Sequence, residues 1–567
     1  MVPGDRDGRR RRRGPLVFSR IDDTSRGGTR PLGLVHLTAL VLFALVVGPL
    51  TCAYGQDART ATDGGTYRRP LGHDPVTLDP ARISDIYSRT VAQQVFDGLA
   101  QYDNTLTPVP ALARFWRSSR DGLTWTFFLR EGVKFHHGRE LTSDDVVYSF
   151  TRLLDPRLKS SAADLFGVIK GSEDFARGKT RTVSGLVVRD RYTVEVTLRE
   201  PSSLPFVALT AVGHAKIVPR DLVEAQGDTF GQHPVGTGPF RFVSWERGKQ
   251  LVLGAHRDYF DGPPRLARIV FRVFPGERFD TVNEEFERGD LEDSSLPGRM
   301  NPAEYRRIVT DSRFVYVKRL MFSLRFYGFN TRVKPLDDRR VRLAIVHAID
   351  RAAIIDRLYL GRPQVAHGIL PPGTPGFDPK LSGYAYDPAR ARQLLAEAGY
   401  PGGAGAPVIT IWSSVKDPVA AEHEMIKHAL ATVGLHVEFT YQSDWPVFSQ
   451  LLNEHRMPAF LYAWYADVPH PDSFLSGLFH SKSARNFMAY ANPVVDGLLE
   501  QARVAGDMQR QVDLYRRVER LVLDDGPIIP FWHYTYERRF QSYVRNVEVN
   551  GMGDAYIPLR KIWLERR

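Results

Sequence analysis

Cysteine is almost absent from this chain of 567 residues, which contains only Cys52. That residue lies at the end of an apolar stretch near the N-terminus, so removal of the stretch would leave a protein without any cysteine. Such a protein forms no disulfide, uses no thiolate nucleophile and binds no metal through cysteine. This near-absence excludes three common kinds of site before any motif is considered.

Short motifs typical of enzymes are missing as well. The sequence has no G-x-S-x-G elbow and no Walker A loop. His423, Glu424 and His428 resemble a zinc-binding helix, but ligands five residues apart lie about 140° from each other around a helix. We therefore expect a solvated helix face there. Residues 236–239 (GTGP) predict a turn, because no helix pattern follows them. We expect no metal, no cofactor and no catalytic site.

Clustered positive charge is missing from most of the chain. The net charge is +11, but residues 1–55 hold nine Arg against four Asp, and the rest has 67 Lys and Arg against 61 Asp and Glu. A nucleic-acid surface needs clustered basic residues, so we expect no nucleic-acid partner. The composition, 43% hydrophobic and 25% charged, is typical of a folded protein, and the length suggests two to four domains of roughly 150 residues.

The N-terminal stretch has the parts of a secretory signal peptide. Residues 32–50 are almost wholly apolar and follow Arg26 and Arg30. Residues 53–55 (AYG) then offer a small-residue cleavage site. We therefore expect residues 1–55 to be a leader that is removed on export.

Two alternatives to a cleaved leader stay open. Residues 31–50 would serve as a retained membrane anchor, because about 20 apolar residues span a bilayer. Cys52 would carry a lipid in a lipoprotein, although Pro49 and Thr51 fit the residues expected before a lipidated cysteine poorly. Translation from near Val17 would shorten the leader without changing the rest of the chain.

The segment from Asp121 to Pro156 carries the clearest local pattern. Apolar residues alternate from Leu123 to Leu129, which predicts a half-buried strand. Thr142 followed by Asp145 is a variant of the capping box and predicts the start of a helix. One face of that helix is apolar: Val146, Val147, Phe150 and Leu154.

Strand and helix patterns alternate along the rest of the chain, as in an α/β layer. We expect strands at 192–198, 435–441 and 459–464. We expect helices that begin at Asp337, at Asp387-Pro388 and at Asp417-Pro418, the last two ending at Gly399 and Gly434.

Several blocks, in order along the chain, resemble the extracellular solute-binding proteins of family 5, the peptide- and nickel-type binding components of ABC importers. Besides residues 121–156, the blocks are 77–80 (TLDP), 95–99 (VFDGL), 236–240 (GTGPF), 329–351 with PLDDRRVRLAIVHAIDR, 386–400 with LLAEAGY, 464–474 with WYAD and PD, and 527–534 with PIIPF. The resemblance spans about residues 66–562, and the exported leader agrees with it.

The resemblance implies an α/β fold of the periplasmic-binding-protein type, with two lobes, a hinge and an extra subdomain on lobe I. Solute would lie between the lobes and be enclosed as they close. The implied hinge crossings lie near 320–328 and 523–533. The expected parts of the chain are leader 1–55, linker 56–64, lobe I 65–97, 206–322 and 526–567, extra subdomain 98–205, and lobe II 323–525.

The resemblance also assigns a ligand-binding role to Asp467. In peptide-binding relatives an acidic residue at this place in the W-x-x-D loop holds the α-ammonium group of the ligand. An amine enclosed in a closed cleft needs a carboxylate, because the pair strengthens as water leaves. The alternative is an aspartate that stabilises the turn at Val468-Pro469.

Further ligand-binding candidates surround this position in the implied fold. Trp464, Trp445 and Trp412 are candidate pocket walls, because aromatic faces accept varied side chains, but each could equally be core packing. Trp532 and Tyr534 belong to the second hinge strand. The remaining candidates are Ser84, Asp85 and Tyr87 on lobe I, and Asn486 and Tyr490 on lobe II. An anchor for a ligand carboxylate is not evident: Leu452 and Leu461 occupy the positions where a cation would be sought.

These patterns predict a monomeric, exported, periplasmic binding protein that is not an enzyme. It would capture a peptide-like solute and deliver it to ABC permease subunits in the inner membrane. A nickel chelate, an oligosaccharide or haem as the solute is the alternative within the class. An exported metal-dependent hydrolase, or a membrane-anchored structural or sensory module, is the alternative outside it.

Overall fold

The computed structural model describes residues 64–200, 206–274, 279–296, 301–416, 419–505 and 507–565. By its internal contacts the chain separates into Met1–Arg59 and Thr60–Arg567, and all described residues belong to the second unit. The expected leader, most of the expected linker and the helix start at Asp417-Pro418 lie outside the described residues.

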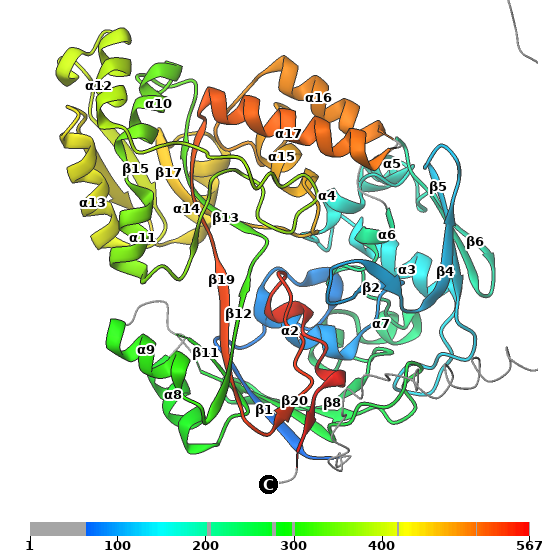
Figure 1. The fold of residues 1–567 in the computed structure, drawn as a ribbon. Helices are drawn as coiled ribbons and strands as arrows, with labels where there is room; N and C mark the ends of the chain where they lie inside the picture. The colour runs from blue at the N-terminus through cyan, green and yellow to red at the C-terminus, as the bar shows by residue number, and fades with distance from the viewer. Residues whose placement is uncertain are drawn as a thin grey trace, which may run out of the picture. The chain divides into compact units, whose positions relative to one another are not determined.

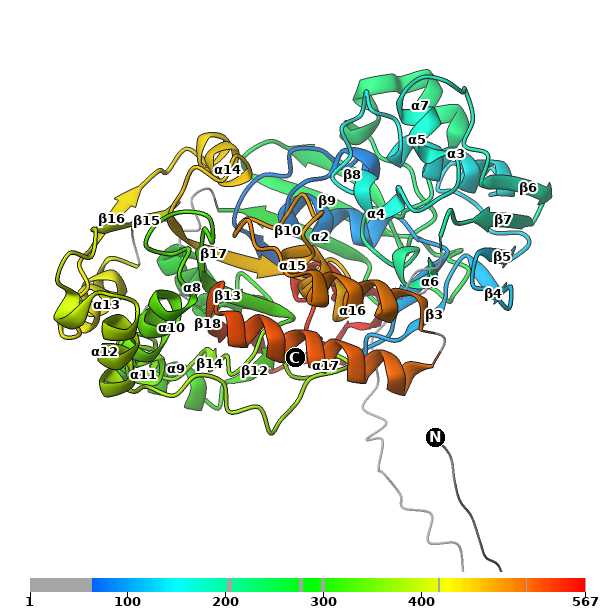
Figure 2. The same cartoon turned by 90° about the horizontal axis from the view of Figure 1, so that it is seen from above.

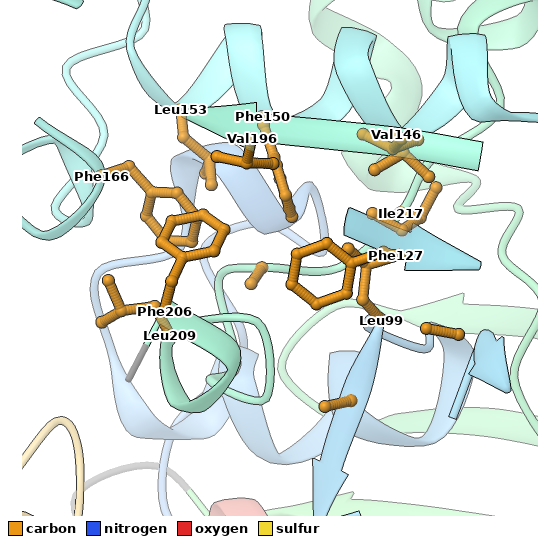
Figure 3. Close-up of a cluster of buried hydrophobic side chains, with 14 of the residues drawn as sticks. Leu99, Phe127, Val146, Phe150, Leu153, Phe166, Val196, Phe206, Leu209 and Ile217 are labelled. Atoms are coloured by element: carbon orange, nitrogen blue, oxygen red, sulfur yellow. The ribbon is translucent and has the colours of Figure 1, made fainter. Parts of the chain in front are cut away.

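A four-stranded antiparallel sheet, of order β4-β5-β7-β6, shares one hydrophobic core with the helices that pack on it (Figure 1). The strands are β4 (Ala113–Ser118), β5 (Thr124–Leu129), β6 (Leu186–Asp190) and β7 (Thr193–Thr197). The helices are α3 (Ser143–Leu153), α4 (Ala163–Phe166), α5 (Ser172–Ala176) and α6 (Phe206–Leu209). Four phenylalanines meet in the core, and their ring centroids lie 5.3–6.3 Å apart in the contacting pairs (Figure 3): Phe127, Phe150, Phe166 and Phe206. The strands and the helix predicted here are confirmed.

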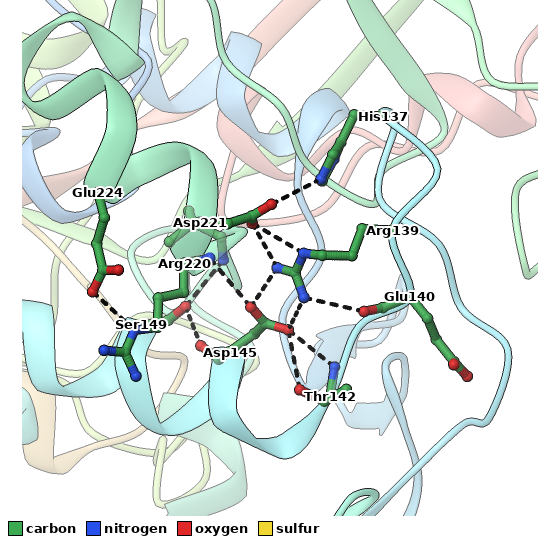
Figure 4. A network of polar contacts seen from close by, with 10 residues as sticks. His137, Arg139, Glu140, Thr142, Asp145, Ser149, Arg220, Asp221 and Glu224 are labelled. Carbon is green, nitrogen blue, oxygen red and sulfur yellow. Dashed lines mark hydrogen bonds and ion pairs between the residues drawn. The ribbon is translucent and has the colours of Figure 1, made fainter.

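Asp145 ties the start of α3 to the neighbouring helix α7 (Arg220–Gln226). Its carboxylate, 2% exposed, accepts hydrogen bonds from the Thr142 backbone N–H at 3.0 Å and from the Arg220 backbone N–H at 3.2 Å. The Arg139 guanidinium donates two more, at 2.7 and 3.0 Å (Figure 4). The predicted capping box is confirmed, and its buried carboxylate also pairs with the partly exposed Arg139 guanidinium.

A second four-stranded sheet, of order β1-β10-β9-β8, has β1 parallel to β10 and the other pairs antiparallel. The strands are β1 (Thr66–Leu71), β8 (Phe240–Glu246), β9 (Gln250–Ala255) and β10 (Arg268–Val273). Helix α2 (Ile86–Val95) shares a hydrophobic core with this sheet. The hairpin β2 (Ala100–Tyr102) and β3 (Pro108–Pro110) follows.

Blocks that are far apart in the sequence meet at Asp97, which is buried behind α2. Its carboxylate accepts hydrogen bonds from the hydroxyls of Thr237 and Tyr259, both at 2.9 Å. A Cβ at Gly236 or Gly238 would lie within 2.1–2.4 Å of the Val95 backbone. The GTGP segment is therefore a turn that packs directly on the helix end, as its sequence predicts.

A six-stranded sheet of order β14-β18-β13-β17-β15-β16 carries cores on both faces. Its strands are β13 (Ser323–Phe329), β14 (Gln364–Val365), β15 (Ile409–Ser413), β16 (Val437–Tyr441), β17 (Ala459–Tyr465) and β18 (Ile528–His533). Along β13, Leu324 and Phe326 face one core while Tyr327 and Phe329 face the other. The strands predicted at 435–441 and 459–464 are confirmed.

Eight helices cover this sheet, and α16 and α17 lie side by side on it (Figure 2). They are α10 (Arg339–Ala348), α11 (Arg351–Tyr359), α12 (Pro388–Glu397), α13 (Ala420–Ala431), α14 (Trp445–Asn453), α15 (Asp472–Phe479), α16 (Pro493–Val504) and α17 (Met508–Asp525). The predicted cap of α12 is confirmed, because Asp387 accepts a hydrogen bond from the Arg390 N–H. The predicted cap of α10 is wrong by one residue: Asp338, not Asp337, accepts from the Arg340 N–H at 2.8 Å.

The chain passes twice between the six-stranded sheet and a three-stranded sheet, β11-β19-β12. The latter contains β11 (Asp293–Ser295), β12 (Phe314–Leu320) and β19 (Thr535–Gln541), accompanied by α8 (Phe279–Arg288) and α9 (Pro302–Thr310). Strand β12 leads into β13, and β18 leads into β19. Because β12 pairs with β19 and β13 pairs with β18, the two passages lie side by side (Figure 1).

Within the described ranges, no helix combines the length and the apolar composition that crossing a bilayer requires. The apolar residues 31–50, to which the anchor hypothesis refers, lie outside those ranges.

Replacement of Asp145 by alanine should destabilise the protein by about 2–3 kcal/mol, because a helix cap and the partner of a half-exposed arginine are lost together. Urea unfolding followed by circular dichroism measures the change. Asp144, exposed in the same helical turn, is the matched control, and Asp144→Ala should shift the unfolding free energy by less than about 0.5 kcal/mol. Equal losses in the two variants would contradict the assignment.

Candidate functional site

The W-x-x-D loop is placed by the register of β17 against β13. Ser323 lies opposite Tyr465, and Leu324 lies opposite Trp464. The loop therefore leaves the sheet beside the passage between the two sheets. Val468 in this loop is buried in the same hydrophobic cluster as Phe150 and Phe166. The loop thus connects the six-stranded sheet with the layer that contains α3.

Asp467 and Trp464 line a cavity of about 850 Å³. Its wall on one side comes from the α15 region and the 480–485 loop, and on the other side from residues 164–165 and 199–200. The Trp464 indole is 6% exposed and donates its N–H to the Ser473 carbonyl at 3.0 Å. Trp464 therefore packs in the core and presents part of its side chain to the cavity, and its ligand role stays a prediction.

The Asp467 carboxylate has a single weak partner in this wall. Its Oδ2 lies 3.4 Å from Nη1 of Arg485, and the two side chains are 26% and 39% exposed. The Arg485 guanidinium also lies over the Trp464 ring, 5.3 Å from its centroid. Asp467 thus offers an accessible acidic group beside an aromatic face.

His214 lies within electrostatic range of Asp467. The imidazole is buried, and its Nε2 is 3.0 Å from Ser161 Oγ and 3.5 Å from an Arg89 nitrogen. Burial, followed by the Arg89 charge, lowers the pKa of His214 to about 4, and the Asp467 carboxylate opposes this shift. At neutral pH this buried histidine is therefore uncharged.

Trp532 and Tyr534 line a different cavity, of about 440 Å³. The Tyr534 ring stacks at 5.5 Å on Tyr465, two residues before Asp467. Leu461 contributes an apolar part of the wall, and cationic groups reach the cavity from Arg325 and Arg362. The structure thus places Trp532, Tyr534 and Leu461 around one cavity and Asp467 and Trp464 around another.

A buried ion pair below the 440 Å³ cavity was not anticipated from the sequence. Arg325 donates two hydrogen bonds to Glu422, at 2.8 and 3.0 Å, and lies 3.9 Å from the centroid of the Trp532 ring. Glu422 also accepts hydrogen bonds from Tyr359, at 2.7 Å, and from Tyr327. Burial disfavours the charged guanidinium, yet the Glu422 carboxylate raises the pKa of Arg325 above its ordinary value. No short-range pattern indicates this pair, whose members are 97 residues apart.

The three lobe I candidates occupy different places. Tyr87 lines a third cavity, of about 310 Å³, and its ring lies 5.0 Å from that of His73. Asp85 caps α2 by accepting hydrogen bonds from the backbone and the hydroxyl of Ser88, at 2.7 and 2.6 Å. Ser84 is exposed and lines none of these three cavities. Of this group, only Tyr87 lines one of them.

The remaining candidates on lobe II make internal contacts. Asn486 is buried and bridges its own loop, donating to the Tyr490 carbonyl at 2.7 Å. The Tyr490 hydroxyl donates to Asp525 at 2.7 Å. Trp412 packs against a core of the six-stranded sheet. Trp445 begins α14, but its side chain lies outside the described part of the structure. Among the described side chains, none of these residues contacts Asp467, and their ligand roles stay predictions.

His423 is buried, so the expectation of a solvated helix face is wrong for this residue. Its ring stacks on Phe439 with centroids 3.9 Å apart, and Nδ1 lies 3.0 Å from the Tyr441 hydroxyl. Glu424 and His428 are exposed, as expected. Across the described ranges, no group of three or more His, Cys, Asp or Glu side chains is arranged to hold a metal ion.

Comparison with known proteins identifies the class. The sequence profile of the bacterial extracellular solute-binding proteins, family 5, middle region, matches residues 107–486. Heme-binding protein A of Haemophilus influenzae is 30% identical over 492 residues, covering 82% of this chain and 86% of that protein. The dipeptide-binding protein of Escherichia coli is 27% identical over 512 residues, covering 85% and 91%. The chain belongs to family 5 of the extracellular solute-binding proteins.

Solved structures agree with this assignment. The periplasmic binding protein DppA of Helicobacter pylori, in complex with the peptide STSA, aligns with a TM-score of 0.74 and 27% identity, covering 89% of this chain and 99% of that one. HbpA2 of Haemophilus parasuis aligns with a TM-score of 0.75 and 27% identity, covering 88% and 100%. The expected family and the expected two-lobed α/β fold are confirmed. The lobe boundaries and the ligand roles of individual residues stay predictions.

His214 should make the protein less stable in acid. Its folded pKa of about 4 lies below the ordinary value of about 6.5, so the unfolded chain binds a proton first as the pH falls between these values. Stability from this residue is complete above pH 6.5 and is lost towards pH 4, by about 2 kcal/mol at pH 4.5. Urea unfolding at pH 7 and at pH 4.5 measures the free energy of unfolding lost between the two pH values. This loss should be smaller in His214→Gln than in the unmodified chain by the same amount. The exposed His428→Gln should behave as the unmodified chain; an equal change in both variants would refute the prediction.

Proposed function

We propose that this protein is the solute-binding component of an ABC importer and that it captures a peptide-like solute through its α-ammonium group. The observation that carries the proposal is the position of Asp467: an accessible carboxylate in the wall of the 850 Å³ cavity, beside the Trp464 ring. A carboxylate in an enclosed, partly apolar space favours a cationic group, and the interaction strengthens as water is excluded. Aromatic walls accept different side chains without dictating their sequence.

The relatives support a peptide as the solute. The curated relatives include di- and tripeptide-binding proteins, and the aligned Helicobacter pylori structure holds a peptide. A heme-binding relative belongs to the same set, so the chemistry at Asp467 has to decide between the two kinds of solute. An exposed acid suits an amine, whereas haem presents carboxylates of its own. We therefore place the peptide first.

Delivery to a transporter follows from this class of function. We infer that the protein is exported, acts in the periplasm as a monomer, and hands its solute to permease subunits in the inner membrane. Binding and lobe closure are its chemistry, without a catalytic step. For closure to report occupancy, the solute must bind the closed form more tightly than the open form.

Native mass spectrometry of the purified protein without residues 1–55, followed by denaturing release, tests the proposal directly. Released peptides would support it and give their lengths. A nickel chelate, a sugar or haem would keep the class and remove the assigned role of Asp467. An empty protein calls for a thermal-shift screen, where a peptide at 100 times its Kd adds about 2.7 kcal/mol of stability.

Asp467→Asn should weaken the binding of peptides with a free amino terminus by about 1.5–3 kcal/mol, because a charge-assisted hydrogen bond is lost. Titration calorimetry with a released peptide measures the change. Glu500→Gln removes the same charge from the same cavity wall and should leave affinity nearly unchanged. Unaltered binding by Asp467→Asn would sink the proposed amine anchor.

A further inference from the structure

The Asp467 carboxylate already forms an ion pair with a cationic side chain of the same protein. Arg485 is the only residue in the described ranges that donates a hydrogen bond to its carboxylate, and the Nη1–Oδ2 distance is 3.4 Å. Both residues line the 850 Å³ cavity. A positively charged group therefore stands at the place where the proposed function puts the ammonium group of the ligand.

The geometry of this pair differs from that of the structural ion pairs. Arg325 and Glu422 form two bonds of 2.8 and 3.0 Å and are at most 4% exposed. Arg485 and Asp467 form one long contact, and both remain in contact with solvent. Partly exposed pairs of this kind contribute little to stability, so a ligand can replace the contact at low cost.

Arg485 has a second favourable surface once it leaves Asp467. Its guanidinium lies 5.3 Å from the centroid of the Trp464 ring, and cations are attracted to the face of an indole. With 39% of its side chain exposed, the guanidinium also stays hydrated. Release from Asp467 therefore leaves no buried, unpaired charge.

Several other charged groups of the cavity wall have partners other than Asp467. Arg503 lies 3.6 Å from Glu200, and Arg199 pairs with Glu173. Asp472 accepts a hydrogen bond from the Tyr515 hydroxyl at 3.1 Å. The Lys482 side chain, which has no ion pair among the described residues, lines the same wall and makes no contact with Asp467.

We propose that Arg485 is a specificity-determining residue: a displaceable counterion of Asp467 that the ammonium group of the ligand must replace. This inference rests on the proposed function. It implies that an uncharged solute gains nothing at this position, because a neutral group neither pairs with Asp467 nor replaces the guanidinium. It also implies that amine ligands bind more weakly than the carboxylate alone would permit.

The test uses the protein without residues 1–55 and two probes. One is an equimolar mixture of synthetic lysine-free peptides of two to five residues with free amino termini; the other is the same mixture after N-terminal acetylation. Native mass spectrometry at several concentrations gives the half-saturation of each peptide. Arg485→Gln should bind the free-amine peptides about two- to fivefold more tightly and the acetylated peptides no differently.

Two further variants make the result specific. Lys482→Gln removes one positive charge from the same wall and should bind like the unmodified chain. In Asp467→Asn the additional change Arg485→Gln should bring no gain, because the competition is gone. The midpoint of thermal unfolding of each variant verifies that its fold is intact.

The outcomes separate this inference from the proposed function. If Asp467→Asn weakens binding but Arg485→Gln brings no gain, the amine anchor stands and the counterion role falls. Weaker binding by Arg485→Gln would overturn the inference by making Arg485 an anchor for a ligand anion. If Arg485→Gln binds acetylated peptides more tightly by the same factor, Arg485 acts only by steric hindrance and the inference is overturned. Failure of all variants to bind either mixture overturns both.

Discussion

The hydrogen bonds that join the two passages between the sheets are the constraint on which the site depends. The Tyr534 backbone N–H donates to Ser323 Oγ at 3.0 Å, and the Met321 N–H donates to the Tyr534 carbonyl at 2.8 Å. The His533 imidazole lies 2.7 Å from the Ser323 carbonyl. Because β17 pairs with β13 from Ser323 onward, this junction also determines where the W-x-x-D loop begins. Tyr465 and Tyr534, which are far apart in the chain, therefore stack through one register.

The blocks that identify the family serve mainly to hold the fold together. Asp79 of the TLDP block receives two hydrogen bonds from Arg152 of α3, at 2.8 and 2.6 Å, and both residues are buried. Asp97 of the VFDGL block receives hydrogen bonds from Thr237 and Tyr259. A buried carboxylate without such partners would cost several kcal/mol, so these blocks require one another. A sequence pattern built from them identifies the fold well and says little about the solute.

What the sequence could predict follows the same division between local and distant interactions. The strand at 124–129, the capping box at Thr142 and the Asp387-Pro388 helix start depend on neighbours within a few residues, and they are confirmed. The burial of His423 depends on Phe439 in another strand, and the Arg325–Glu422 pair joins a strand to a helix. Helical spacing alone predicts that His423 is exposed. It gives no sign that Glu422, the neighbouring residue, forms a buried ion pair. Asp467 could be proposed as a ligand-binding residue because its loop belongs to a recognised block. Arg485 belongs to no such block.

The two arginine–carboxylate pairs near the cavities show how burial separates structural from functional charges. Breaking the Arg325–Glu422 pair would leave an uncompensated charge in the core, which costs about 3–5 kcal/mol, so no solute can use either group without unfolding its surroundings. The Arg485–Asp467 pair is half open to water and held by one long contact, and its rupture costs little. A binding protein needs its recognition charge to be neutralised when empty and available when solute arrives. Of the two pairs, only the Arg485–Asp467 pair meets both requirements, which supports the proposal that recognition takes place at the W-x-x-D loop.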